Sequence, residues 1–575
     1  MALIIAINLF SILTYAYSSE DRIPFLSRDL NSDTLEYFLP IKEFKQSFSL
    51  LRDPVTLENQ ETINPRVNLA YVLYGITDLF LENPWLTNAF VTFLLTTATC
   101  LVIVLLSPPR WGLWSLVFCA SFYVGGFALT DGIFVIKKFV SLAIPALSPH
   151  KQLGLPVLLS PTRTLFYLLL FALLFLWLKY VADPSLSKRL IPILGILFAT
   201  SFFVHFYLAG MFAVLLTLSA LFSRDLMRSV IVILLYGVPS LLLFLSHTVI
   251  FASQRTASDV YLRLGVFVEK VLVLPSVIHV AFFVLFLLLL YQTTLDRRMK
   301  IVLALIIPTG ILLDNIGLLG FPSPQPGNNS VIAAFVLFPF FVTILGSEWI
   351  APWIEKQSKI GQSSAKIATS FLMLFVLALV LQNIVVFKDR NTSLYTNGEL
   401  AKVLHFVHMQ TPDDSVVLAN QDITDAVLVY SHNNAYIPLG FASLSSNEEI
   451  VQRFVEGNLL LGKTLPEIRE MLHETRTLNI LFHHGWMNKS DIGFSVWGPT
   501  ILWATTKSPI PSIAEHTLRT QSDALLLPSY ALHYVIVSSA DRPKNRTFEG
   551  SQILFQNQNY IVYRWHPLTS TESSA

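Results

Sequence analysis

The sequence predicts a multi-span α-helical membrane protein of about 11 transmembrane helices, followed by a C-terminal α/β domain outside the membrane. Three observations predict it: apolar segments recur between Ala2 and Phe387, Lys and Arg recur in alternate short loops, and the composition turns polar after Phe387. Hydrophobic residues make up 53% of the chain and charged residues 13%, which is typical of a chain that faces lipid. The formal net charge of +1 leaves no basic excess, and we therefore exclude nucleic acid as a partner.

Most of the apolar segments approach the roughly 20 residues that a bilayer requires. They lie at about residues 2–17, 88–107, 112–130, 164–181, 189–206, 207–222, 229–250, 271–291, 301–320, 331–350 and 367–387. We expect the first segment to remain as a helix, because residues 15–19 match a processing motif only weakly; a cleaved signal peptide is the alternative. Residues 189–222 could instead form one long bent span, which would reverse the orientation of every later loop.

The basic residues of the short loops determine the predicted orientation. If Met1 is cytoplasmic, every cytoplasmic loop carries Lys or Arg, as the positive-inside rule requires. These residues are Arg110, then Lys179 with Lys188 and Arg189, Arg224 with Arg228, Arg297 with Arg298 and Lys300, and Lys356 with Lys359 and Lys366. A single span at 189–222 would move Arg297, Arg298 and Lys300 outside. The rule therefore favours two spans there and an outer location for the C-terminal domain.

Two long inserts interrupt the transmembrane domain, residues 1–387, on its outer side. The first outer loop, residues 18–87, is far longer than a turn between neighbouring helices and is therefore our first candidate for chemistry. Within it, a short helix should begin near Asp33, and residues 67–76 carry an apolar stripe that suits a helix on the membrane surface. The second outer loop, residues 131–163, repeats this pattern on a smaller scale.

Residues 388–575 are typical of a soluble α/β domain with about 190 residues, enough for a core of its own. The predicted elements are helices at 399–410 and from 447, strands at 415–419, 478–482 and 533–538, and a hairpin at 552–555 and 560–565. The domain has no cysteine and therefore no disulfide framework. Cys100 and Cys119 lie in consecutive spans at similar depth and could touch.

Ionisable residues in the spans are unevenly distributed. Seven of them fall in the outer half of the membrane under this topology: Asp131, His205, His247, Glu269, Lys270, His279 and Asp314. The inner half carries only the usual anchors at helix ends. Because charged groups in lipid are costly, this distribution indicates a cavity that opens outward. Asp314 lies deepest, where a hydrogen-bonded role in helix packing is at least as plausible as catalysis.

The order of first span, acidic outer loop, amphipathic helix, further spans and terminal α/β domain resembles the GT-C glycosyltransferases, which use polyprenyl-phosphate-linked sugars. The residues that carry the resemblance are short segments: 29–40, 205–210, 411–419, 440–443 and 448–453. Many members have an adjacent acidic pair in the first loop, whereas Asp29, Asp33 and Glu36 of this chain are spaced apart. The resemblance implies a polyprenyl-phosphate sugar donor and an envelope acceptor as partners, besides the lipid bilayer.

Sugar transfer from a lipid phosphate needs a general base for the acceptor hydroxyl and positive charge for the departing phosphate. Asp33 is the predicted base, and Glu36, one helical turn on, could assist or help to bind a divalent metal. No specific motif identifies a metal, and the metal requirement stays open. The spacing of Asp33 and Glu36 also fits a capping box that simply starts a helix.

Candidates for the donor phosphate or its cavity share a position near the predicted outer rim. They are His205, Arg163, Arg255, Arg263, Lys270 and Asp131. Each cation could instead anchor its span at the lipid headgroups, and Asp131 with Gly132 could form a turn.

The sequence suggests three candidate functions. The leading one is a membrane enzyme, an inverting glycosyltransferase of the bacterial cytoplasmic membrane with its C-terminal domain outside. The second is a non-catalytic envelope membrane protein on the same scaffold that binds a glycan or a partner. The third, a flippase or transporter of lipid-linked glycans, should place polar groups through the inner half of the bundle, and this sequence lacks them.

Overall fold

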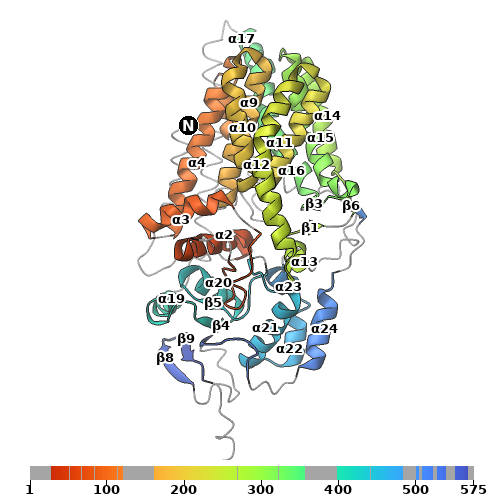
Figure 1. The fold of residues 1–575 in the computed structure, drawn as a ribbon. Helices are drawn as coiled ribbons and strands as arrows, with labels where there is room; N and C mark the ends of the chain where they lie inside the picture. Colours follow the sequence, from red (N-terminus) through yellow and green to blue (C-terminus); the bar gives the residue numbers. More distant parts are fainter. Residues whose placement is uncertain are drawn as a thin grey trace, which may run out of the picture.

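The computed structural model places a helical bundle above an α/β unit, with part of the first outer loop between them (Figure 1). We call the end of the bundle next to the α/β unit the domain end, and the opposite end the far end. The structure describes residues 28–48, 50, 52–65, 68–82, 84–112, 114–120, 161–267, 270–321, 323–324, 326–356, 398–440, 442–482, 500–503, 508–521, 527–538 and 551–566.

Nine helices of the bundle match the predicted spans. They are α4 (Pro84–Leu106), α5 (Trp114–Ala120), α9 (Pro161–Ala182), α10 (Ser187–Val204), α11 (Phe206–Phe222), α12 (Met227–Ala252), α14 (Val277–Gln292), α15 (Arg297–Asp314) and α16 (Asn328–Leu345). Among the described residues, four stretches, at 86–106, 163–182, 224–252 and 328–353, are long and apolar enough to cross a membrane. The predicted spans 2–17 and 367–387 lie outside the described residues, as does 112–130 after Ala120.

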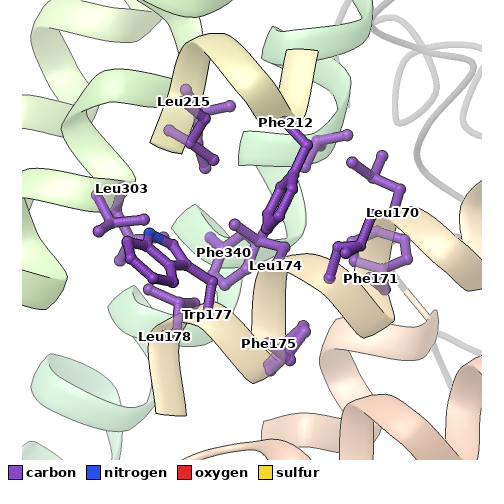
Figure 2. Close-up of a cluster of buried hydrophobic side chains, with 14 of the residues drawn as sticks. Leu170, Phe171, Leu174, Phe175, Trp177, Leu178, Phe212, Leu215, Leu303 and Phe340 are labelled. Atoms are coloured by element: carbon purple, nitrogen blue, oxygen red, sulfur yellow. The ribbon is translucent and has the colours of Figure 1, made fainter. Parts of the chain in front are cut away.

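Helix α9 lies at the centre of the bundle because it is apolar on every side. Figure 2 shows Phe171, Phe175 and Trp177 of α9 packed with Phe212 of α11 and Phe340 of α16. Aromatic rings meet edge to face around it, as in the pairs Phe118–Phe171 at 5.5 Å and Trp111–Phe175 at 6.2 Å between centroids.

The outer helices of the bundle leave apolar side chains exposed. Examples are Leu235, Leu242 and Val249 of α12 and Leu285 and Leu288 of α14. Such a surface is costly in water and suits contact with lipid.

Loops that the positive-inside rule assigns to one side meet at the far end of the bundle. The Arg110 guanidinium lies 3.7 Å from the Glu348 carboxylate and donates a hydrogen bond to the Thr294 hydroxyl. The Arg298 guanidinium likewise forms an ion pair with the Asp225 carboxylate. Three predicted cytoplasmic loops and the end of the predicted span 331–350 are therefore neighbours in space.

The stretch 189–222 forms two helices, α10 and α11, as predicted. His205 separates them with an extended backbone, φ −166° and ψ 117°. The start of α10 and the end of α11 adjoin the basic residues Arg189 and Arg224, whereas the break at His205 lies against the first outer loop, whose Asn68 donates a hydrogen bond to the Val204 carbonyl. One long span is therefore excluded for this stretch.

Two span boundaries differ from the prediction. Residues 272–274 form a short strand, β2 (Leu272–Leu274), and α14 begins at Val277, where Ser276 caps the helix by accepting from the His279 N–H. Helix α15 ends at Asp314 rather than near 320, and a 3₁₀ turn (Ile316–Leu319) follows it.

The C-terminal part is built on a five-stranded sheet with the order β5-β4-β7-β9-β8. The strands are β4 (Val416–Ala419), β5 (Asn434–Ala435), β7 (Tyr534–Ser538), β8 (Gln552–Gln556) and β9 (Tyr560–Arg564). Strands β5, β4 and β7 are parallel, and β9 and β8 are antiparallel to their neighbours. The predicted strand at 415–419 and the predicted hairpin are present.

Helices cover both faces of this sheet. Alternate residues of β4 face opposite layers: Val416 and Leu418 pack with α21 (Asn447–Leu460), α22 (Leu465–Met471), α23 (Thr475–Phe482) and α24 (Ile510–Thr520), and Val417 and Ala419 pack with α19 (Gly398–Gln410) and α20 (Gln421–Tyr430). The strand predicted at 478–482 is wrong, since these residues end α23. A short apolar run fits a buried helix as well as a strand.

The described part of the first outer loop contains two helices, α2 (Arg28–Ser47) and α3 (Leu69–Leu81). The Asn68 side chain caps α3 by accepting from the Ala70 N–H. One stripe of α3 stays exposed, formed by Leu69, Leu73, Ile76 and Phe80. This stripe is the apolar face that the sequence predicts for a helix on the membrane surface.

Asp314 joins two helices of the bundle. Its carboxylate accepts hydrogen bonds from the backbone N–H groups of Gly327, Asn329 and Ser330 at 2.8–3.0 Å, at the start of α16. We expect Asp314→Ala to lower the free energy of unfolding by about 2–4 kcal/mol, because it leaves these buried donors unpaired. Thermal unfolding of the protein in detergent measures the effect.

Asp296→Ala is the matched control. Asp296 also accepts a hydrogen bond from a helix N-terminus, that of α15, but this site is exposed. Its loss should cost only about 1 kcal/mol. Equal effects of the two substitutions would contradict the role given to Asp314.

Candidate active site at the domain end

Helix α2 lies between the bundle and the α/β unit (Figure 1). Its residues Phe38, Leu39 and Ile41 are buried in one cluster with Val91 of α4 and Leu428 of α20. The cluster thus holds side chains from the first outer loop, the bundle and the C-terminal part. The helix that carries the predicted base is therefore at the junction of all three.

Asp33 and Glu36 both lie on α2, three residues apart and hence on neighbouring positions of the helix surface. Since α2 begins at Arg28, Asp33 is inside the helix and not at its N-cap. The capping-box interpretation of Asp33 and Glu36 is therefore wrong. The side chains of both residues lie outside the described part of the structure.

His205 and Arg163 are brought together at the domain end. The His205 ring lies between Tyr207 and Phe166, with centroids at 4.6 and 5.4 Å. Arg163, at the start of α9, is close enough to interact electrostatically with His205. Asn68 of the first outer loop donates a hydrogen bond to the carbonyl of Val204, so the loop runs directly over this helix break.

The other predicted cations have different surroundings. Arg255, after α12, and Lys270, before β2, are exposed. Asp131 lies outside the described residues. None of these three is placed beside His205 by a contact in the described part of the chain.

Arg263 does not fit the predicted role in phosphate binding. It ends α13 (Ala257–Arg263) and is 0% exposed. Its guanidinium donates to the carbonyls of Gly440, Ser443 and Ser445 and to the Asn447 side chain, at 2.6–3.0 Å. The prediction is wrong because these acceptors, some 180 positions away, already satisfy the charge.

Asp53 is a buried charge of the first outer loop that the sequence analysis missed. Its carboxylate accepts hydrogen bonds from the backbone N–H groups of Val55, Thr56 and Leu444 and from the hydroxyls of Thr56 and Ser443. Burial raises the pKa of this carboxyl, and the hydrogen bonds oppose that rise. Nothing in the local sequence distinguishes Asp53 from an exposed loop aspartate.

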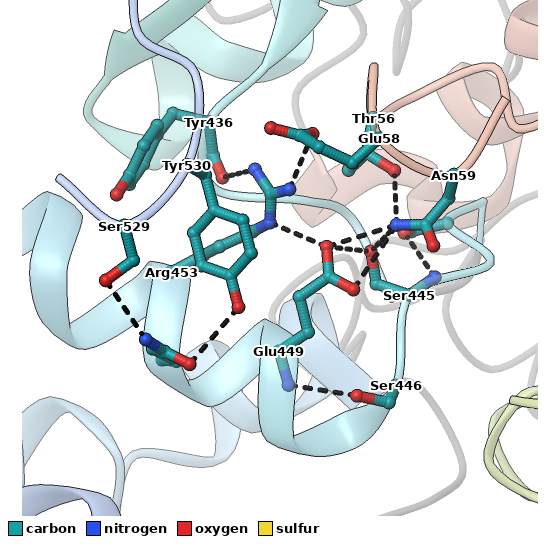
Figure 3. A network of polar contacts seen from close by, with 12 residues as sticks. Thr56, Glu58, Asn59, Tyr436, Ser445, Ser446, Glu449, Arg453, Ser529 and Tyr530 are labelled. Atoms are coloured by element: carbon teal, nitrogen blue, oxygen red, sulfur yellow. Dashed lines mark hydrogen bonds and ion pairs between the residues drawn. The ribbon is translucent and has the colours of Figure 1, made fainter. Parts of the chain in front are cut away.

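A second polar network joins the first outer loop to α21 (Figure 3). Arg453, which is fully buried, pairs with Glu58 at 2.6 Å and with Glu449 at 2.8 Å. The ring of Tyr530 lies 3.8 Å from its guanidinium carbon. Asn59 adds hydrogen bonds to Ser445 and Glu449. The first outer loop is thus an integral part of the α/β unit.

Strand β2, between α13 and α14, pairs antiparallel with β6 (Thr500–Trp503) of the C-terminal part. Asn315, after α15, donates to the carbonyl of Val273 and accepts from its N–H. Strand β2 therefore joins the C-terminal part to the bundle, and Asn315 holds this strand against the end of α15.

A metal site is not visible in the ranges that the structure describes. Among those residues, no group of three or more His, Cys, Asp or Glu side chains is arranged to hold an ion. Cys100 and Cys119 are buried and free, and the Cys119 sulfur lies 4.0 Å from the Cys100 carbonyl oxygen.

The solved structures to which this chain is similar include the following two. The chain is similar to ArnT from Cupriavidus metallidurans bound to undecaprenyl phosphate, with 11% identity and a TM-score of 0.49 over 98% of this chain and 97% of that one. It is also similar to the archaeal oligosaccharyltransferase AglB from Archaeoglobus fulgidus in complex with an inhibitory peptide and a dolichol-phosphate, with 11% identity and a TM-score of 0.43 over 93% of this chain and 69% of that one.

Both solved structures are GT-C proteins, the family that the sequence resembles. A scan against protein-family models and a search of curated proteins found no match.

The burial of Arg263 leads to a test of domain docking. Arg263→Ala leaves four buried acceptors without their donor, and we expect a loss of about 3–5 kcal/mol in the stability of the bundle–domain junction. Limited proteolysis of the protein in detergent should then cut between α13 and α21 at lower protease concentration.

Arg255→Ala is the control for this substitution. It removes the same side chain eight residues earlier, where it is exposed. The cleavage pattern of this variant should match the wild type. If Arg263→Ala also matched the wild type, the docking role would be refuted.

Lys42 predicts a pH dependence of the same junction. Its ammonium donates to the carbonyls of Leu428 and Asn433 at 3.0 and 3.1 Å, and burial lowers the pKa of Lys42 to about 8. Between that pKa and the ordinary value near 10.5, the unfolded chain holds a proton that the folded chain has released. Stability should therefore rise with pH over this window.

Lys42→Met should flatten that rise. Thermal unfolding from about pH 7.5 to about pH 9.5 compares the variant with the wild type. Lys402→Met, at an exposed position of α19, controls for the loss of a lysine. A rise as steep in Lys42→Met as in the wild type would contradict this account.

Proposed function

We propose that this protein is an inverting glycosyltransferase that moves a sugar from a polyprenyl phosphate to an envelope glycan, lipid or protein at the outer face of a bacterial cytoplasmic membrane. One observation carries the proposal: α2, the helix with Asp33 and Glu36, is fixed between the bundle and the α/β unit. A lipid-linked donor in the membrane and a polar acceptor outside it would meet at this junction.

The residues of the domain end supply the parts of such a reaction. The oxygen of the acceptor hydroxyl attacks the anomeric carbon of the donor sugar, and Asp33 accepts the proton of that hydroxyl. The bond between the anomeric carbon and the phosphate oxygen breaks, and both of its electrons stay with the phosphate. Arg163, beside His205, supplies positive charge for the departing phosphate. Lys270 and Arg255, both exposed, are further candidates at the rim.

The location of polar groups supports an enzyme over a transporter. His205, Arg163, His247 and the first outer loop all belong to the domain end of the bundle. Transport of a headgroup across the membrane would need polar groups that continue to the far end.

Asp33→Asn tests the proposed base. We expect sugar transfer from an undecaprenyl-phosphate donor to a membrane acceptor to fall on the order of 10² to 10⁴-fold, because the amide cannot take the proton. The assay uses membranes with equal amounts of wild-type and variant protein and follows a radiolabelled sugar. Transfer at the wild-type rate would refute the assignment.

Glu43→Gln is the matched control on the same helix. Glu43 accepts a hydrogen bond from Ser47 within α2 and has no proposed role in transfer. This variant should keep the wild-type rate, which separates loss of the base from a general disturbance of α2.

A further inference from the structure

A groove in the C-terminal part takes no part in the junction described above. It lies between α21 and α24, is open to solvent and has a volume of about 490 Å³. Helix α21 lines it with Glu448 and Gln452, and α24 lines it with Ser512, His516 and Thr520. Its volume falls within the range of about 300–1,000 Å³ that is usual for ligand sites.

The spacing of these residues shows why they face the groove. Ile510, Ala514 and Leu518 of α24 are four residues apart and are buried in the core. A second stripe of α24 has the same spacing but begins two positions after Ile510, and it therefore points to a different side of the helix. It consists of Ser512, His516 and Thr520. Glu448 and Gln452 are likewise four residues apart on α21. Both polar stripes border the groove.

Hydrogen bonds to neighbouring residues hold the side chain of Gln452 in place. Its Nε2 donates to Glu456 at 2.9 Å and to Ser529 at 3.2 Å, and its Oε1 accepts from the Tyr530 hydroxyl at 3.2 Å. Because the amide is fixed before a ligand arrives, less conformational entropy is lost on binding.

The chemistry of the lining selects a class of ligand. A carboxylate, an amide, an imidazole and hydroxyls offer hydrogen bonds, whereas Ile513 is the one apolar side chain and neither Lys nor Arg lines the groove. An anionic ligand would meet Glu448 without a countercharge, and an apolar ligand would desolvate the polar groups without compensation. A neutral, hydroxyl-rich molecule satisfies both conditions.

We propose that the groove between α21 and α24 binds a neutral glycan. If the protein has the proposed function, this glycan is the acceptor strand. Its role as acceptor rests on the proposed function, whereas its binding in the groove does not. The glycan hydroxyls donate to Glu448 and exchange hydrogen bonds with His516 and the hydroxyls of α24.

The test measures binding of soluble oligosaccharides to the full-length protein in detergent by microscale thermophoresis. The probes are chitotriose and maltotriose, which are neutral, and trigalacturonate, which is acidic. We expect a neutral probe to bind and trigalacturonate not to bind. His516→Ala and Glu448→Ala should each weaken binding about tenfold, the loss of one good hydrogen bond to a ligand.

The control is His473→Ala, which removes an exposed histidine just after α22, outside the groove. It should bind like the wild type. Failure of both neutral probes to bind, equal affinity of His516→Ala and His473→Ala, or binding of trigalacturonate would overturn the proposal.

Asp33→Asn separates this proposal from the proposed function. The variant should bind the neutral probe like the wild type while losing sugar transfer. If Asp33→Asn transfers sugar at the wild-type rate and binds the neutral probe, only the catalytic assignment is refuted. If Asp33→Asn loses sugar transfer as expected but no neutral probe binds to the protein, only the glycan site in the groove is refuted.

Discussion

Two buried charges of opposite sign hold the molecule together at one short segment of the C-terminal part. Arg263, from the membrane-side helix α13, donates to the carbonyls of Gly440, Ser443 and Ser445. Asp53, from the first outer loop, accepts from the N–H of Leu444 in the same segment. A cation satisfies the carbonyl oxygens and an anion satisfies the amide, and therefore the backbone of one loop compensates both buried charges.

This arrangement decides where the candidate chemistry lies. The loop that carries Asp53 also carries α2, and α13 continues the long helix α12 of the bundle. Both are fixed to one segment of the α/β unit, and α2 lies between that unit and the ends of the spans. The break at His205 and the start of α9 at Arg163 belong to the same end. The catalytic proposal therefore depends on docking as much as on the acidic residues themselves.

The network around Arg453 extends this connection into the α/β unit. Glu58 of the first outer loop binds Arg453, whose neighbour Gln452 forms part of the groove between α21 and α24. Contacts within one network are energetically coupled, since each side chain limits the positions of the next. The groove and the junction both involve side chains of α21.

The sequence by itself determined the elements that follow from local physics. The length of the apolar runs predicted the helices of the bundle, the basic loops predicted two helices at 189–222, and short apolar runs next to turn residues predicted β4, β7 and the β8–β9 hairpin. Helix and strand patterns depend on residues within a few positions, and they were readable for that reason. The strand predicted at 478–482 failed where a short apolar run fits both patterns.

Only the tertiary structure decided what each polar residue does. Arg255 and Arg263 are the same residue type eight positions apart, yet one is exposed and the other is buried against carbonyls about 180 positions away. Asp33 and Asp53 likewise share a loop, and the docked partner of Asp53 lies beyond residue 440. The role of a charge depends on the groups that compensate it, and the chain brings those groups together only when it folds.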